Sequence, residues 1–512
     1  CASSMVATSQ PLAAIAGLDV LGNGGNAVDA ALAAAMALAV VEPCSNGIGS
    51  DAFAVVHHDG ALHGLNASGR CPAAWTPGHF SRYDGMPTLG WDSVTVPGAV
   101  SGWVALADRF GTMPLTNLVE HAARHARDGY QVSPQAAASW KRSADRFKDF
   151  PAWQSTFAPD GRTPGAGERF TCPDQARTLE EIASTNGASF YEGDLADGIL
   201  RASRSENGLL EAEDLASHRA EWVDVLGMDY RERRLHELPP NGQGIVALVA
   251  AGILDRHDAS RLEPDDPLLL HLQIESMKHA FATCKPELGC PGTMDCNVDS
   301  LLEGSSLDAL ADLIDPAQAH DPGHVVVTDA STVYLAVADA NGMMVSFIQS
   351  NYMGFGSGVV IPGTGIAMQN RGACFIQDPG HPNEVRGGRR PYHTIIPGFI
   401  TREGVAETAF GVMGGHMQPQ GHLQVLSRMV DHGQNPQAAL DAPRWRIDRG
   451  RRVHLEPGFA ESTIQGLRDR GHEIELADAC SVQFGGGQVI RRVAGGYVGG
   501  SDSRRDGLAI GR

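Results

Sequence analysis

An alanine-rich run over Ala27–Val41 places the strongest constraint on how this chain folds. Asn26 precedes the run and Asp29 lies three residues later, which indicates a helix N-cap and an acidic residue in the first turn. Glu42-Pro43 ends the predicted helix, because the residue before a proline avoids helical geometry. Its small apolar side chains imply close packing in the protein interior.

Helical periodicity recurs through the first two-thirds of the chain, and strand patterns dominate afterwards. Further helices are predicted over residues 99–110, 115–127, 175–184, 244–254, 267–282, 421–431 and 460–470, with a looser proline-rich segment over 285–324. Strands are predicted over residues 5–8, 325–328, 333–338, 344–349, 394–400 and 488–492, with a hairpin turn at Asn341-Gly342. Strands in both parts with helices outside them predict an α+β fold of four αββα layers.

Composition narrows the class of protein. A chain of 512 residues with 42% hydrophobic and 20% charged residues is globular, with room for two or three domains or one large layered domain. The formal net charge of −20 argues against nucleic-acid and anionic-membrane partners, which favour basic surfaces. No apolar run reaches the roughly 18 residues of a membrane span, so we expect none.

The nine cysteines are odd in number and widely spread, which is not typical of a disulfide framework. Cys284, Cys290 and Cys296 are equally spaced in one loop-like stretch, so a metal or disulfide role stays open for them. No CxxC pair is present, and zinc sites usually have shorter spacings. Unpaired thiols are the expected state.

Thr332 lies where a stretch of small polar residues, Asp329-Ala330-Ser331, meets an apolar strand. A hydroxyl residue at this place is a weak signal by itself, because threonine is a common strand former. A plain strand start is the alternative.

Motifs spread along the chain favour a catalytic role for Thr332 over a plain strand start. In chain order they are Met5-Val6-Ala7, Pro11-Leu12-Ala13, Gly24-Gly25-Asn26-Ala27-Val28-Asp29-Ala30-Ala31, Glu42-Pro43, Gly47-Ile48-Gly49, Val96-Pro97-Gly98, Asp339-Ala340-Asn341-Gly342, the segment 346–358, Pro362-Gly363-Thr364-Gly365-Ile366, Gln369-Asn370-Arg371 and Gly414-Gly415. Together they resemble the γ-glutamyltranspeptidase family of N-terminal nucleophile hydrolases, in particular its transpeptidase-like and acylase-like sub-branch. The likeness covers nearly the whole chain in the right order.

The resemblance implies that Thr332 is a processing threonine. Its hydroxyl would attack the Ser331 carbonyl, and hydrolysis would leave segments 1–331 and 332–512 within one layered domain. A free N-terminal threonine carries its own base, because its α-amino group, with an ordinary pKa of about 8, can take the hydroxyl proton. Neither metal nor organic cofactor is implied.

Three further residues are catalytic candidates by the same resemblance. Gly414 and Gly415 match the oxyanion element, where backbone N–H groups face a developing negative oxygen. Ser350 matches a hydroxyl that supports the nucleophile, and a buried strand serine is the alternative.

Departures from the family pattern concern the substrate. Asp92 stands where an arginine would hold the glutamyl α-carboxylate, and Cys374 where an aspartate would hold the α-amino group. His393-Thr394 replaces a serine pair. The stretch 374–391 is short for the lid loop of many bacterial members, so we expect a more open site. Ordinary γ-glutamyl recognition is not expected.

A guanidinium could supply the missing carboxylate anchor. The candidates are Arg371, Arg389 and Arg390, each with a structural ion pair as its alternative. For Arg371, the negative partner is either Asp92 or a substrate carboxylate. The other expected substrate-binding residues are Asn351, Tyr352, Gln369, Asn370, His393 and Thr394, and His416 is a further pocket-lining candidate.

We therefore predict a self-processing amidohydrolase or acyltransferase that cleaves the amide of a small acidic acyl donor through an acyl-enzyme. Water or an amine would be the acceptor. The alternatives are a dedicated small-amide hydrolase or acylase, oxamate-like or cephalosporin-acylase-like, and an unprocessed binding protein. The expected partners are a small-molecule amide and the two segments of one precursor, and a dimer of heterodimers stays open. We expect a cytoplasmic location, with a periplasmic or secreted one left open because the native N-terminus is not shown.

Overall fold

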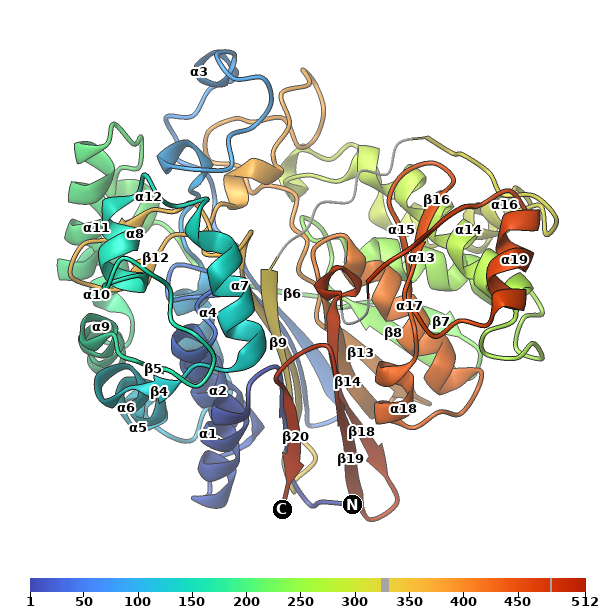
Figure 1. Ribbon diagram of the computed structural model, residues 1–512, viewed down its shortest axis with the longest axis horizontal. Helices are drawn as coiled ribbons and strands as arrows, with labels where there is room; N and C mark the ends of the chain where they lie inside the picture. Colours follow the sequence, from blue (N-terminus) through green and yellow to red (C-terminus); the bar gives the residue numbers. More distant parts are fainter. Residues whose placement is uncertain (324–330, 479–480) are drawn as a thin grey trace.

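Two antiparallel β-sheets lie face to face in a computed structural model, with helices on both outer sides (Figure 1). The structure describes residues 1–323, 331–478 and 481–512. The strand predicted over 325–328 lies outside these residues. The four-layer αββα arrangement confirms the predicted α+β fold.

The first sheet has seven strands in the order β20-β1-β9-β10-β2-β3-β6. Their bounds are β1 Met5–Thr8, β2 Asp51–His58, β3 Ala61–Ala67, β6 Glu221–Val223, β9 Ser331–Ala338, β10 Met344–Tyr352 and β20 Leu508–Gly511. The hairpin of β9 and β10 turns at Asn341-Gly342, as predicted, and Gly342 has a positive φ of 93°. Strand β9, which begins with Ser331, is thus central in the sheet.

The second sheet has six strands in the order β19-β18-β14-β13-β8-β7. Their bounds are β7 Leu226–Tyr230, β8 Arg233–Glu237, β13 Gly398–Arg402, β14 Val405–Met413, β18 Gly486–Val493 and β19 Gly496–Ser501. Strands from before and after Ser331 are hydrogen-bonded to one another in both sheets. The two halves of the chain therefore share one layered body.

Three apolar layers hold the four structural layers together. On β9, Val333 and Leu335 pack toward the helices of the first half, whereas Tyr334 and Ala336 pack between the sheets. This alternation follows from the two-residue repeat of a strand. Close approach of the sheets requires Gly411 on β14, where a Cβ atom would lie 2.4 Å from the Tyr334 ring.

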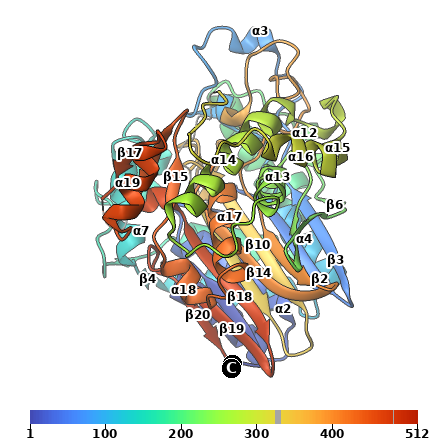
Figure 2. The same cartoon turned by 90° about the vertical axis from the view of Figure 1, so that its right-hand side faces the viewer.

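Helices α1 (Pro11–Gly22) and α2 (Ala27–Val41) cover the first sheet, and α13 (Gly244–Asp255), α14 (Pro267–Cys284) and α17 (Met417–Val430) cover the second (Figures 1 and 2). Every residue of α2 is buried, as its alanine-rich sequence predicted. The Asn26 and Asp29 side chains form a capping box at its start.

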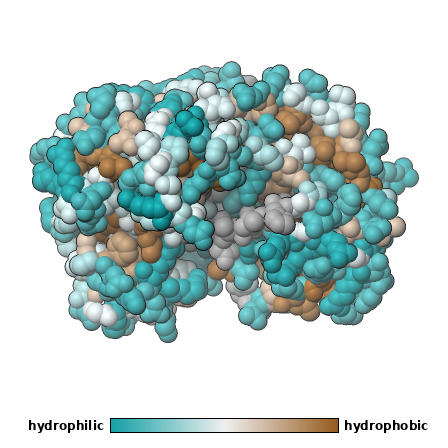
Figure 3. Space-filling view, turned by 90° about the horizontal axis from the view of Figure 1, so that it is seen from above, coloured by the Kyte–Doolittle hydropathy of each residue, from teal (hydrophilic) through white to brown (hydrophobic). Residues whose placement is uncertain are grey.

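The remaining helices lie mainly around the first sheet. They are α3 Pro77–Phe80, α4 Ala99–Phe110, α5 Leu115–Leu118, α6 Glu120–Asp128, α7 Pro134–Ala144, α8 Pro151–Phe157, α9 Pro173–Ser184, α10 Ala188–Glu192, α11 Asp194–Ser205, α12 Ala212–Ala216, α15 Val298–Leu301, α16 Gly304–Ala311, α18 Pro436–Asp441 and α19 Glu461–Asp469. The helix predicted over 115–127 is divided at Val119 into α5 and α6. The face seen from the α3 end is mainly hydrophilic, with apolar residues in separate groups (Figure 3).

The strand predictions need correction. The strand predicted over 394–400 begins only at Gly398, because His393 bridges to Gly242 and Pro397 has no N–H for a ladder bond. Strand β14 was not predicted, although it lies in the middle of the second sheet, and neither were β2, β3, β6, β7, β8, β19 and β20.

The described cysteines, which exclude Cys480, are all free thiols, including Cys284, Cys290 and Cys296. Within the described ranges, no helix is long and apolar enough to cross a membrane.

Candidate active site

Thr332 is the second residue of β9, and its side chain is fully buried. It lies on the same strand face as Tyr334 and Ala336, so it points between the two sheets. The neighbouring strand β10 has an irregular register between Gln349 and Tyr352, directly opposite this position. The irregularity brings the side chain of Ser350 to Thr332.

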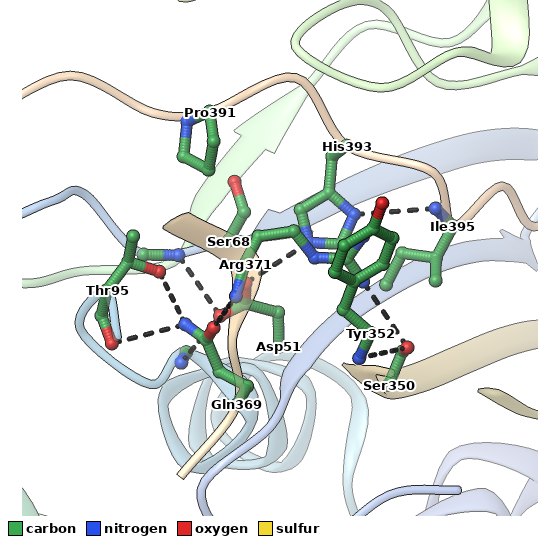
Figure 4. A network of polar contacts seen from close by, with 12 residues as sticks. Asp51, Ser68, Thr95, Ser350, Tyr352, Gln369, Arg371, Pro391, His393 and Ile395 are labelled. Carbon is green, nitrogen blue, oxygen red and sulfur yellow. Dashed lines mark hydrogen bonds and ion pairs between the residues drawn. The ribbon is translucent and has the colours of Figure 1, made fainter. Parts of the chain in front are cut away.

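The Ser350 hydroxyl contacts one group on each side of the bond between Ser331 and Thr332. Its Oγ donates to the Ser331 carbonyl oxygen at 2.9 Å and accepts from the Thr332 Oγ at 3.1 Å. The backbone N–H of Tyr352 donates to the same Oγ at 2.8 Å (Figure 4). This arrangement polarises the carbonyl and holds the threonine hydroxyl beside it.

Arg371 lies behind this pair and is fully buried. Its guanidinium donates to the Thr394 Oγ1 at 2.8 Å and to the Ser350 Oγ at 3.3 Å. The Tyr352 ring lies over it, with 4.5 Å between the ring centroid and Cζ (Figure 4). Among the described residues Arg371 makes no ion pair, and its Nε has no acceptor.

Asp51 and His393 form a buried pair whose electrostatics are coupled to Arg371. His393 Nε2 lies 3.1 Å from Asp51 Oδ2, and the backbone N–H groups of Gly69 and Gly98 donate to Oδ1. Burial raises the pKa of Asp51 to about 7, although the charge of Arg371 opposes the shift. Burial and the same charge hold the pKa of His393 well below its usual range. His393 is therefore neutral at pH 7.

Gly414 and Gly415 follow β14 with positive φ angles of 121° and 62°. Neither backbone N–H donates to an acceptor in the described part of the chain. Gly414 and Ser331 line the same cavity of about 270 Å³. The N–H of Gly414, which shares this cavity with Ser331, and that of the adjacent Gly415 are suited to bind a negatively charged oxygen.

A separate cavity of about 460 Å³ lies beside Tyr352. Its polar lining groups include Lys285, Cys374, Asn383, Tyr392 and His416, and its apolar ones include Phe281, Phe375 and Ile376. Burial lowers the pKa of His416 to about 3, so its ring is neutral at pH 7. Of the expected substrate-binding residues, Tyr352 lines this cavity, as does the pocket-lining candidate His416.

The other expected substrate-binding residues lie behind the cavity surface. Gln369 Nε2 donates to the Thr95 carbonyl at 3.1 Å, and Asn370 Oδ1 accepts from the Met353 N–H at 3.1 Å. Asn351 Oδ1 accepts from the Ser50 Oγ at 2.7 Å. These contacts place the three amides as supports of the loops around the site.

Asp92 is not the partner of Arg371, so that alternative is wrong. Its carboxylate accepts from Tyr83 Oη at 2.6 Å and Arg82 Nη2 at 2.5 Å, and it pairs with His79. Arg390 forms a structural ion pair with Glu221 at 2.5 Å, and Arg389 donates to the Glu384 carbonyl. Neither provides an anchor in the cavity beside Tyr352.

Asp51 and Lys285 are the site residues that sequence reasoning missed. Asp51 opens an otherwise apolar strand directly after Gly47-Ile48-Gly49. A charged residue at the start of a buried strand is unusual, and that pattern could have identified it. Lys285 has no comparable signal, because it follows the end of an ordinary helix.

One cluster elsewhere has a geometry suited to a metal ion. The ligand atoms of His271, Glu275 and His472 lie within 4.8 Å of one another. The Lys278 ammonium contacts Glu275 at 2.8 Å, and the two histidines share a hydrogen bond of 2.8 Å. The Lys278 ammonium already neutralises Glu275, so we assign no metal to the cluster, although the Nδ1 of His472 has no hydrogen-bond partner among the described residues.

Comparison with known proteins finds similarity along the whole chain. The family model described as gamma-glutamyltranspeptidase matches residues 13–512. The glutathione hydrolase-like YwrD proenzyme of Bacillus subtilis (strain 168) is 34% identical over 520 residues, covering 99% of this chain and 98% of that protein. The oxamate amidohydrolase proenzyme of Klebsiella pneumoniae subsp. pneumoniae is also 34% identical over 520 residues, with coverage of 99% and 98%.

A solved structure extends the similarity to three dimensions. The crystal structure of cephalosporin acylase from Bacillus halodurans matches with a TM-score of 0.96 and 48% sequence identity. The match covers 100% of this chain and 96% of that one.

Proposed function

The chain belongs to the γ-glutamyltranspeptidase family, and we propose that it cuts its own backbone before Thr332 and then uses Thr332 as its nucleophile. Within that family it is an amidohydrolase or acyltransferase. The observation that carries this proposal is the double contact of Ser350 with the Ser331 carbonyl and the Thr332 hydroxyl. A single group thereby aligns the attacking oxygen with the carbonyl that it attacks. The proenzyme names of the relatives support the same order of events.

Self-cleavage proceeds through an ester. The Thr332 Oγ attacks the Ser331 carbonyl carbon, the carbon–nitrogen bond breaks, and the hydroxyl proton passes to the released α-amino nitrogen. Ser350 donates to the carbonyl oxygen as negative charge develops there. Water then hydrolyses the ester, which leaves a carboxylate on Ser331 and a free N-terminus on Thr332.

Turnover reuses the same groups. The α-amino group of Thr332 accepts the hydroxyl proton as the Oγ attacks the substrate carbonyl. The unoccupied N–H groups of Gly414 and Gly415 are suited to stabilise the oxyanion. An acyl ester forms on Thr332, the amine leaves with the proton, and water or a second amine removes the acyl group.

The cavity beside Tyr352 receives the acyl group. Lys285 and Cys374 line this cavity, and Cys374 stands in the position where the family anchors the amino group. Arg371 lies directly behind Tyr352, which forms part of the cavity wall. Positive charge at this wall favours a small acidic acyl donor. Arg371 is our candidate anchor, acting through the positive potential that it adds at Tyr352.

The acyl donor is not a γ-glutamyl group in this proposal. Asp92 is held by Arg82 and Tyr83 on the outside of the site, so no arginine occupies the usual carboxylate-binding position. Cys374 cannot hold an ammonium group as an aspartate would, because burial raises its thiol pKa and keeps it neutral. These contacts favour a dedicated small-amide hydrolase or acylase.

Denaturing electrophoresis and N-terminal sequencing test the proposal. Purified protein should give two fragments, corresponding to 1–331 and 332–512, and the smaller should begin with Thr-Val-Tyr-Leu. Thr332→Ala should remain a single chain. A single band from the native sequence would favour an unprocessed binding protein, and a cut at another bond would contradict Thr332 as the nucleophile. A screen with glutaryl, oxamyl and γ-glutamyl amides would identify the acyl donor.

A further inference from the structure

The cavity shared by Ser331 and Gly414 has an arginine-rich wall that the proposed chemistry does not use. Arg142, Arg146 and Arg505 all line it, together with the small or polar residues Cys44, Ser139, Ser143 and Gln483. We propose that this wall binds a carboxylate on the amine half of the substrate. The inference rests on the proposed function, because it assumes that Thr332 attacks an amide.

None of the three guanidinium groups pairs with a carboxylate among residues 1–323, 331–478 and 481–512. Arg142 donates to the Ser139 Oγ at 2.8 Å, and Arg146 donates to the Thr88 carbonyl at 3.4 Å. The Nε of Arg505 is buried and has no acceptor. Most other arginines that face the interior, such as Arg444 and Arg504, contact acidic partners.

Arg142 is exposed, whereas Arg146 and Arg505 are partly buried. Partly buried positive charge without a partner is costly unless an anion compensates for it. Burial lowers the pKa of Arg146, which is the direction expected for a cation that has lost water without gaining a partner. Glu42 is a buried acid whose charge interacts with that of Arg505, and its carboxylate accepts from the Ser9 hydroxyl at 2.6 Å. Burial raises the pKa of Glu42, and the charge of Arg505 opposes that rise.

The position of the cavity indicates which half of the substrate it receives. Cys374 and Tyr352 line the acyl cavity, whereas Gly414 and Ser331 line the arginine cavity. The acyl cavity therefore holds the residues that match acyl recognition in the family, and the arginine cavity holds none of them. An amide bound at Thr332 with its acyl group in the first cavity directs its amine group toward the second.

The chemical class of the leaving amine follows from this wall. A guanidinium binds a carboxylate through directed, charge-assisted hydrogen bonds. An amine that carries a carboxylate, such as an amino acid or an aminobenzoate, matches the wall, whereas a neutral amine offers it no charged partner. The same site would accept a carboxylated amine as the acyl acceptor.

Equilibrium binding tests the inference without requiring turnover. We would titrate the mature enzyme with 3-aminobenzoate and with 3-aminobenzamide, which differ mainly in charge. The proteins compared are the native sequence, the double variant Arg146→Gln with Arg505→Gln, and the control Arg124→Gln. Arg124 lies on the exposed side of α6, where its guanidinium contacts the His121 ring. Cleavage before Thr332, followed on a gel, separately tests the proposed function in each protein.

The native enzyme should bind 3-aminobenzoate at least about tenfold more tightly than the amide, since two charged contacts are involved. The double variant should lose that preference while still cutting itself, and the control should keep it. Equal affinities in the native enzyme, no measurable binding of either compound, or a preference retained in the double variant would each overturn the inference. Normal self-cleavage in those cases would leave the assignment of Thr332 intact.

Discussion

The hydroxyl of Ser350 donates a hydrogen bond of 2.9 Å to the carbonyl oxygen of Ser331, across two adjacent strands of one sheet. The Ser350 Oγ also accepts a hydrogen bond of 3.1 Å from the Thr332 hydroxyl. Ser350 thus binds the residues on both sides of the scissile bond, so its removal should affect self-cleavage.

Ser350→Ala should slow self-cleavage by at least about tenfold, because the Ser331 carbonyl loses its donor. The measurement is a time course of fragment formation on a denaturing gel. Ser346→Ala is the matched control, since Ser346 is also buried on β10 but contacts the Tyr334 hydroxyl at 2.7 Å. Equal rates for the two variants would show that Ser350 has only a structural role.

Arg371→Gln should raise KM for an acidic acyl amide by about tenfold, because the positive charge behind Tyr352 is lost. KM for a neutral acyl amide of the same size should change little. Comparing glutaryl and butyryl anilides measures the difference. A parallel rise for both substrates, or a loss of stability with unchanged affinity, would indicate that Arg371 only supports Ser350 and Thr394.

Glutathione should be a poor substrate. Each missing charge-assisted contact costs roughly 1.5–3 kcal/mol, and both usual anchoring positions differ here. The measurement is the hydrolysis rate of glutathione and of γ-glutamyl anilide, each compared with glutaryl anilide at equal enzyme concentration. A KM for glutathione near the roughly 1 μM lower end of the enzyme range would mean that other residues hold the glutamyl group.

The free energy of unfolding should depend on pH through Asp51. Its carboxyl pKa rises from 3.8 to about 7 on folding, so the folded state favours the protonated form. The stabilisation is fully present below pH 3.8 and is lost as pH rises through about 7. One proton contributes a slope of at most about 1.4 kcal/mol per pH unit in this window.

Asp51→Asn should remove that slope, because an amide keeps the acceptor for Gly69 and Gly98 without titrating. Denaturant unfolding between pH 4 and about 8 measures the effect. Both proteins should carry Thr332→Ala, so that each unfolds as one chain. The prediction fails if the difference between the two unfolding curves is independent of pH.

Local features of the fold could be predicted because their causes lie within a few residues. The capping box of Asn26 and Asp29 and the turn at Asn341-Gly342 depend only on neighbouring backbone groups. The start of the predicted strand over 394–400 was wrong because His393 pairs with Gly242, far away in the chain. Strand β14 was missed although its partner β13 directly precedes it in the chain, and its other partner, β18, comes from a distant segment.

The sequence by itself determined the family and the place of Thr332 at the head of a strand. The strand repeat then fixes which side chains share the face of Thr332. The resemblance named Ser350 as a support of the nucleophile, and the tertiary structure shows how the two meet, because the irregular register before Tyr352 sets the contact. Only the tertiary structure decided that Asp92 lies with Arg82 and that Arg371 lies beneath Tyr352. Such pairings depend on how separate loops pack at the ends of the sheets, which periodicity and spacing do not encode.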